Sequence, residues 1–173
     1  MSSLREIIKR KQAKNIAIIG KGISIDKVGL ANLEDFIIIN MNDSELLVPG
    51  EICVFHDAWV LDFLKKNEPK CDLYYSDKEI DDKVRQVLCD FIPSNPENVQ
   101  FLMTRFFSDK IYLEQHLILS ALRVADEIGR IVGTAPNCFL LGFDFSTKTG
   151  YTEKMATVNH HAADYSDHMV STQ

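Results

Sequence analysis

NIAIIG at residues 15–20 is the stretch that decides the fold, because it is a continuous apolar run that stops at a glycine. Apolar runs of similar length recur along the chain. Strands that are apolar at successive positions are typical of a parallel sheet that is covered on both faces. We predict strands at residues 15–19, 36–40, 51–55, 72–75, 99–104 and 138–142.

Helical patterns separate these runs. Ser3 and Glu6 have the spacing of a capping box and predict a short helix at 3–13. Three further helices are predicted. The first spans 58–66, the second begins at a second capping box formed by Ser76 and Glu79, and the third spans 111–132. The last of these carries one apolar stripe: Leu117, Ala121, Val124, Ile128 and Ile131. We therefore predict an α/β fold, with a doubly wound, mostly parallel, Rossmann-like sheet of about six strands and helices on both faces.

The length of 173 residues fits a single α/β domain over 1–173. Residues 146–173 are polar, and we predict a lid or tail that leads into a helix. That helix pattern has no stop signal, so we expect one module of a longer protein. Apolar residues make up 46% and charged residues 25%, which excludes disordered, collagen-like and disulfide-scaffold classes.

Charge and cysteine usage narrow the choice of partners. The net charge is −6, and residues 1–14 carry five basic residues against one acidic residue, so the acidic remainder argues against nucleic-acid binding. Residues 1–14 form either a solvated helix face or a peripheral contact with an anionic membrane. No apolar run is long enough to span a membrane or to form the core of a signal peptide, so we expect a cytoplasmic protein. Buried free thiols are expected at Cys53, Cys71, Cys89 and Cys138.

Polar residues follow the predicted strands at their carboxyl ends, where open parallel sheets bind ligands. They include Gly20, Lys21, Gly22, Ser24, Asn40, Asn42, Asp43, His56, Asp57, Gly142 and Asp144. The glycine loop is either a phosphate or nucleotide loop, or a tight turn with Ser24 as a helix cap. The dinucleotide fingerprint is not met because Ile25 stands at its third glycine, and no Walker loop is present.

Each of the other polar residues has two interpretations. Asn40 and Asn42 suit recognition of hydroxyls and base edges, or simply form a turn. His56 is either structural or a substrate contact, and Asp57 either caps the following helix or contacts substrate. Asp144 ends a very apolar strand, where a carboxylate must be solvated or hydrogen-bonded, so it is a candidate for organising the site.

A cluster of histidines and acids occupies residues 160–168. Its members are His160, His161, Asp164, Asp167 and His168, with Tyr165 between them. Such a cluster serves as a general base or substrate contact, as a transition-metal site, or as a solvated surface segment. The spacing matches no known zinc pattern, so we assign no metal.

Two longer stretches resemble bacterial sialyltransferases of glycosyltransferase family 42 and related sialyltransferase-like proteins. They are NIAIIGKGISIDKVGLANLEDFIIINMND and ALRVADEIGRIVGTAPNCFLLGFDFSTKTGY. Gly20, Gly22 and Ser24 match the family's glycine loop, and Asn42 takes the place of its asparagine. Lys21 stands where the family usually has asparagine, Ile23 where it has proline, and Asn40 where it has arginine.

The resemblance implies a CMP-activated nonulosonic acid as donor substrate, a glycan acceptor, and no metal or other cofactor. It implies His161 as the general base on the acceptor hydroxyl, with His160 and His168 as rivals. Tyr151 and Tyr165 are the candidates for the tyrosines that steady the departing phosphate.

Three functions follow from these observations. The first is a sialyltransferase-like module that binds a nucleotide-activated sugar, most simply a cytidine-based one, in bacterial surface-glycan biosynthesis. The second is a non-catalytic glycan- or nucleotide-binding domain attached to a catalytic partner. The third is a metal-dependent hydrolase or transferase that uses His160, Asp164 and His168.

Overall fold

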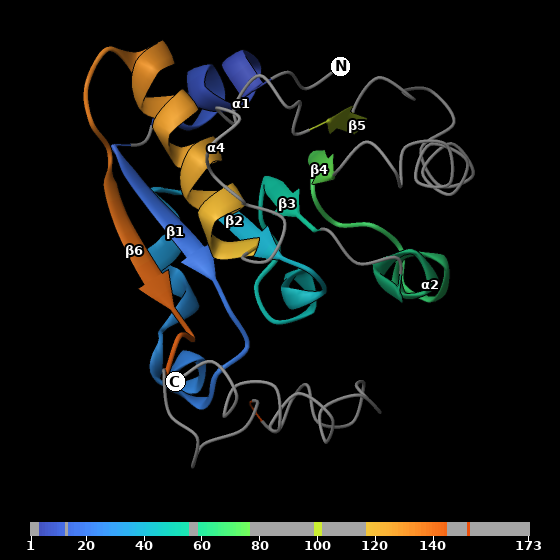
Figure 1. The fold of residues 1–173 in the computed structure, drawn as a ribbon. Helices are drawn as coiled ribbons and strands as arrows, with labels where there is room; N and C mark the ends of the chain where they lie inside the picture. The colour runs from blue at the N-terminus through green and yellow to red at the C-terminus, as the bar shows by residue number, and fades with distance from the viewer. Residues whose placement is uncertain are drawn as a thin grey trace.

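The computed structural model describes residues 4–12, 14–55, 59–76, 99–101, 117–144 and 152. Its strands form one parallel sheet in the order β5-β4-β3-β2-β1-β6 (Figure 1). The strands are β1 (Asn15–Ile19), β2 (Phe36–Met41), β3 (Ile52–Val54), β4 (Leu73–Ser76), β5 (Val99–Phe101) and β6 (Asn137–Leu141). The predicted α/β class with a parallel sheet is therefore confirmed.

The chain builds this sheet outward from β1. It passes from β1 through β2, β3 and β4 to β5 in one direction, and β6 then pairs with the opposite side of β1. β1 pairs with both neighbours along its whole length, so that Ile18 lies beside Ile39 of β2 and Leu140 of β6. The loops after β1 and β6 consequently meet at the same edge of the sheet.

Two helices cover one face of the sheet (Figure 1). They are α1 (Leu4–Lys11) and α4 (Leu117–Val132). Their apolar side chains share one cluster with alternate residues of the strands, such as Ile16 and Ile18. The predicted stripe of the long helix is confirmed, because Ala121, Val124 and Ile128 are buried there. Burial of this kind contributes roughly 25 cal/mol per Å² of apolar surface, and it fixes which side of each strand faces the helices.

The opposite face is covered by α2 (Trp59–Lys66) and by three short 3-10 helices. These are η1 (Ile23–Lys27), η2 (Leu30–Leu33) and η3 (Ser44–Leu46). Phe55 and Tyr74 pack under α2, whereas Ala17 and Ile19 pack under η1 and η2. Among the described helices, none is long and apolar enough to cross a membrane.

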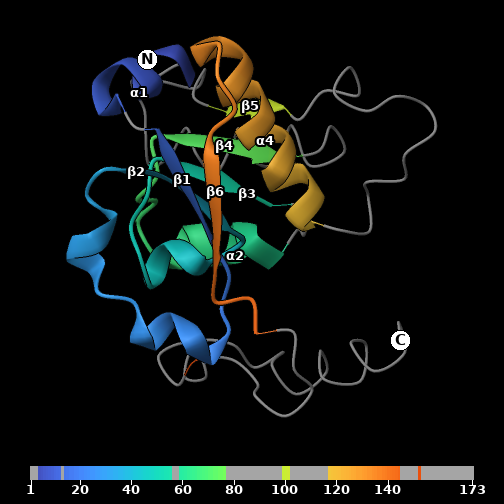
Figure 2. The same ribbon diagram turned by 90° about the vertical axis from the view of Figure 1, so that its left-hand side faces the viewer.

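β6 differs from the prediction of a strand covered on both faces. It lies at the edge of the sheet, and Phe139 and Leu140 keep 45% and 40% of their surface exposed (Figure 2). The prediction of a buried thiol is wrong for Cys138, which is exposed, and is confirmed for Cys53 and Cys71. The reason is topological, since β1 is the sole neighbour of β6 among the described strands. Cys89 lies outside the described residues.

Candidate functional site

The loop after β1 is bonded directly to the end of β6. We call residues 20–24 the β1 loop. The Gly20 N–H donates to the carbonyl of Leu141 and the Gly22 N–H donates to the carbonyl of Gly142, both at 2.7 Å. Residues more than a hundred positions apart in the sequence therefore form one continuous wall at the carboxyl edge of the sheet.

The glycines of this wall are required by the close approach of two backbones. A Cβ on Gly20 would lie 2.6 Å from the Gly142 carbonyl oxygen, and a Cβ on Gly22 would lie 2.2 Å from Asp144 Oδ2. Gly142 itself has a φ of +75°, in the left-handed region that favours glycine. Packing between β1 and β6 thus accounts for the glycine pattern without a ligand.

Asp144 holds the start of η1. Its Oδ2 accepts the N–H of Ser24 at 3.0 Å, and hydrogen bonds with Ser24 lower the pKa of Asp144. The interpretation of Ser24 as a helix cap is wrong, because Gly22 is the N-cap and makes no side-chain bond. A phosphate bound at this point would compete with a carboxylate for the Ser24 N–H. The β1 loop is therefore better suited to hold a ligand through Lys21 than through its backbone.

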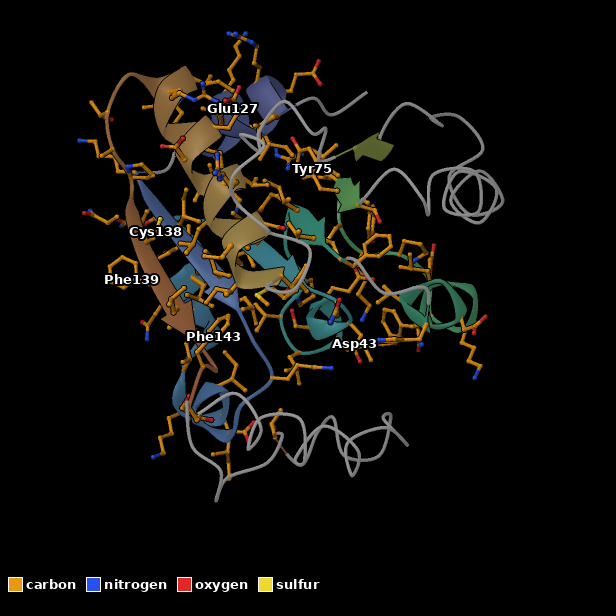
Figure 3. All side chains as sticks on the ribbon, in the orientation of Figure 1. Asp43, Tyr75, Glu127, Cys138, Phe139 and Phe143 are labelled. Carbon is orange, nitrogen blue, oxygen red and sulfur yellow. The ribbon has the colours of Figure 1, made fainter. Side chains whose placement is uncertain are left out.

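Lys21 points toward the end of β2 and is largely enclosed. Its Nζ lies 2.8 Å from Asp43 Oδ1, and the two side chains are only 10% and 1% exposed. Nζ also lies 5.2 Å from the centre of the Trp59 ring, within reach of a cation–π interaction. Figure 3 shows Asp43 at the carboxyl edge of the sheet, just after the end of β2.

Two buried polar atoms beside this ion pair have no hydrogen-bond partner among the described residues. They are Asn42 Oδ1, an acceptor, and Trp59 Nε1, a donor. Asn42 has a φ of +54°, which an asparagine tolerates better than most residues. A buried polar group without a partner costs about 1–3 kcal/mol. Among the described residues, this part of the site therefore retains one acceptor and one donor without a partner.

Asn40 is positioned differently from Asn42. Its side chain is fully buried, with Oδ1 lying 3.1 Å from Ser44 Oγ and Nδ2 lying 3.5 Å from Cys71 Sγ. A Cβ on Gly50 would lie 2.4 Å from the Asn40 Nδ2. Asn40 therefore links β2 to Ser44 and Cys71 in the interior of the protein.

The carboxyl group of Glu45, in η3, is also buried. Tyr74 donates its hydroxyl proton to Glu45 Oε2 at 2.8 Å, and the backbone N–H of Cys71 donates to the same hydroxyl at 3.0 Å. Burial raises the pKa of Glu45. At the end of β4, Ser76 is also buried, and its hydroxyl has no partner among the described residues.

Thr152 connects the chain beyond β6 to the β1 loop. Its N–H donates to the Lys21 carbonyl at 2.9 Å. Its hydroxyl lies 2.9 and 2.8 Å from the two carboxylate oxygens of Asp26 in η1. Thr152 is fully buried.

The structure divides the residues predicted from sequence into three groups. Gly20, Gly22, Ser24, Gly142 and Asp144 form the wall between β1 and β6, Lys21 and Asn42 lie beside Asp43, and Asn40 is inside the protein. The remaining predicted site residues lie outside the described residues: His56, Asp57, Tyr151, His160, His161, Tyr165 and His168.

Sequence reasoning missed three residues of the site: Asp26, Trp59 and Thr152. Trp59 is the single tryptophan of the sequence and so offered a signal. Asp26 and Thr152 offered none, because their hydrogen bond spans 126 positions.

Comparison with known proteins adds no relative. No family model, no curated protein and no solved structure matches the chain.

Within the described part of the chain, no group of three or more His, Cys, Asp or Glu side chains could hold a metal ion. Chemically, the described site offers a cation for an anionic ligand group, a carboxylate and an amide for hydroxyls, and an indole N–H.

Proposed function

We propose that this protein is a sialyltransferase-like module that binds a nucleotide-activated sugar, most simply a cytidine-based one, at the carboxyl edge of its sheet. The gathering of Lys21, Asn42, Asp43 and Trp59 at the ends of β1, β2 and β3 is the observation that carries the proposal. A lysine suits a phosphate, and the amide and carboxylate suit sugar and base. The setting that we propose is cytoplasmic surface-glycan assembly in bacteria, with a glycan as acceptor.

We also propose the doubly wound, Rossmann-like form of the fold, with about six strands. The strand order supports it, because the sheet grows from β1 in both directions. In open parallel sheets, ligands bind outside the carboxyl ends of the strands, near the point where the strand order reverses. Lys21 belongs to the loop after β1, at this edge of the sheet.

Tryptophan fluorescence provides a direct test of binding. Trp59 is the only tryptophan in the sequence and lies against Lys21, so the intrinsic emission reports on the proposed site. The protein would be titrated with CMP, CDP, UDP, GDP, ATP and NAD. We expect CMP and CDP to change the emission and the other nucleotides to have little effect. At a concentration of ~100 times its dissociation constant, CMP should also stabilise the protein by about 2.7 kcal/mol.

Variants of Lys21 and Asp43 test whether CMP changes the fluorescence by binding at this site. Lys21→Met alone would leave Asp43 buried without its cation, so the informative variant is Lys21→Met combined with Asp43→Asn. We expect this double variant to fold and to lose the response to CMP. Lys66→Met, on the exposed side of α2, is the control and should bind as the native protein does. If no nucleotide changes either the emission or the thermal stability of the native protein, the proposal is wrong.

Catalysis is a separate part of the proposal. With His161 as the general base, His161→Ala should reduce sugar transfer from a CMP-activated donor by about 10²–10⁴-fold while CMP still binds. The same loss in His160→Ala or His168→Ala, with His161→Ala unaffected, would move the role to that histidine. Transfer that all three variants retain would exclude the cluster as the base.

A binding module without catalysis is the second candidate. The described part of the site offers a cation, a carboxylate, an amide and an indole N–H, which are groups that bind polar ligands. Selective binding of CMP with no transfer or hydrolysis of a CMP-activated sugar would favour this candidate. A stoichiometric transition metal in the purified protein would instead favour the metal-dependent enzyme.

A further inference from the structure

We propose that Thr152 and Asp26 are positioning residues for Lys21, so that the chain beyond β6 helps to build the ligand-binding edge. The proposal rests on the proposed function for its ligand measurement, and on Trp59 for a measurement without ligand. Both act on the backbone that carries the Lys21 ammonium.

Thr152 binds the β1 loop at Lys21 and η1 at Asp26. The Thr152 N–H donates to the Lys21 carbonyl at 2.9 Å, and the Thr152 hydroxyl is shared between the two Asp26 oxygens at 2.9 and 2.8 Å. Asp26 belongs to η1, which begins within the β1 loop at Ile23. Thr152 has no exposed surface, whereas Asp26 is exposed, so these bonds are partly buried. A hydrogen bond to a carboxylate is roughly twice as strong as one between neutral groups.

The other side of the same loop is fixed to β6. Gly20 and Gly22 donate to β6 and the residue after it, and Asp144 accepts the Ser24 N–H. Lys21 therefore lies in a backbone segment that is held from both sides. A lysine side chain has four rotatable bonds, so its Nζ stays beside Asp43 and Trp59 only while its backbone is fixed. We infer that losing the bond between Thr152 and Asp26 moves the Lys21 ammonium.

The test compares Thr152→Val, which keeps the shape of the side chain, with Thr152→Ser, which keeps its hydroxyl. Asp26→Asn is the partner variant on an exposed residue, and Asp35→Asn in the turn before β2 is its matched control. Without ligand, we expect Thr152→Val and Asp26→Asn to shift the Trp59 emission, whereas Thr152→Ser and Asp35→Asn should leave it unchanged. With CMP, we expect Thr152→Val to bind about tenfold more weakly, which corresponds to about 1.4 kcal/mol.

Two results would overturn the proposal. One is a Thr152→Val protein with native Trp59 emission and native affinity for CMP. The other, should Thr152→Val fail to fold, is Asp26→Asn behaving as Asp35→Asn does in both measurements. If the native protein binds no nucleotide, the proposed function fails, and the Trp59 emission of the same variants alone decides the positioning role.

Discussion

β1 and β6 are neighbouring strands of similar composition with opposite surroundings. NIAII and NCFLL pair residue by residue, and the amide of Asn137 even bonds to the side chain of Asn15 at 3.0 Å. The four apolar residues of β1 are fully buried, whereas β6 is exposed along most of its length. Figure 3 shows Phe139 beside the β6 ribbon, at the edge of the sheet. Position in the sheet, rather than composition, decides how much apolar surface a strand buries.

The largest effect is expected from truncating the two strands at one register position. Ile18 has no exposed surface, and its partner Leu140 is 40% exposed. Ile18→Ala should lower the free energy of unfolding by about 2–5 kcal/mol, and Leu140→Ala by less than about 1.5 kcal/mol. Urea denaturation of the two variants measures the difference. Equal losses would show that β6 is covered in solution.

The next effect tests the contact between the two strand ends. Gly20→Ala would place a Cβ 2.6 Å from a backbone carbonyl oxygen that cannot move alone, so we expect a loss of about 1–3 kcal/mol. Gly29→Ala is the control, because Gly29 has an ordinary φ of −73° and meets only the end of the Asn32 side chain. Thermal unfolding should show Gly29→Ala to be nearly neutral. A neutral Gly20→Ala would argue against the close approach of β1 and β6.

Two carboxyl groups should respond to pH with opposite signs. Burial raises the pKa of Glu45, so its contribution to stability is complete below its ordinary value near 4.5 and is lost as the pH rises. Hydrogen bonds to Ser24 lower the pKa of Asp144, so its contribution is present above its ordinary value near 3.8 and is lost as the pH falls. At pH 7, Glu45→Gln should therefore stabilise the protein and Asp144→Asn should destabilise it.

Urea midpoints measured from pH 3 to 8 would test these signs. Both differences from the native protein should shrink as the pH falls, because each native carboxyl group then takes up a proton and comes to resemble its amide replacement. The same sign for the two variants at pH 7 would contradict the contrast between an interior carboxyl group and one at the edge of the sheet.

The smallest perturbation is thiol labelling of the folded protein. Cys138 of β6 is exposed, while Cys53 of β3 and Cys71 before β4 are buried, and burial raises the pKa of each buried thiol. In a Cys89→Ser background, we expect one thiol to react quickly and two to react only on unfolding. Mass spectrometry would identify the labelled residue. Rapid labelling of Cys53 would show that the interior of the sheet opens readily.

Much of the fold was predictable because its signals are local. The apolar runs at 15–19 and 36–40 became strands, and the stripe through Ala121, Val124 and Ile128 became the buried face of a helix. The exposure of β6 was not predictable, because its sequence reads as a covered strand. A run of apolar residues specifies a preference for burial, but the neighbouring elements decide whether that burial is achieved.

The candidate site was predictable in place and only partly in composition. The rule that ligands bind at the carboxyl ends of parallel strands selected Lys21, which forms an ion pair with Asp43. It also selected Asn42, the residue before Asp43. The same rule also selected Asn40, whose burial between Ser44 and Cys71 no sequence pattern indicates. The bond between Thr152 and Asp26 depends on where two distant segments meet.

The sequence by itself determined the class of fold, because hydrophobic periodicity and glycine breaks act over a few residues. It also determined that glycines would follow β1 and β6. Only the tertiary structure decided their purpose, which is to let two backbones approach closely enough for the Gly20 and Gly22 N–H groups to bond to β6 and the residue that follows it. Only the tertiary structure paired Lys21 with Asp43 and Trp59. Such contacts depend on the order of strands in the sheet, which no short stretch of sequence encodes.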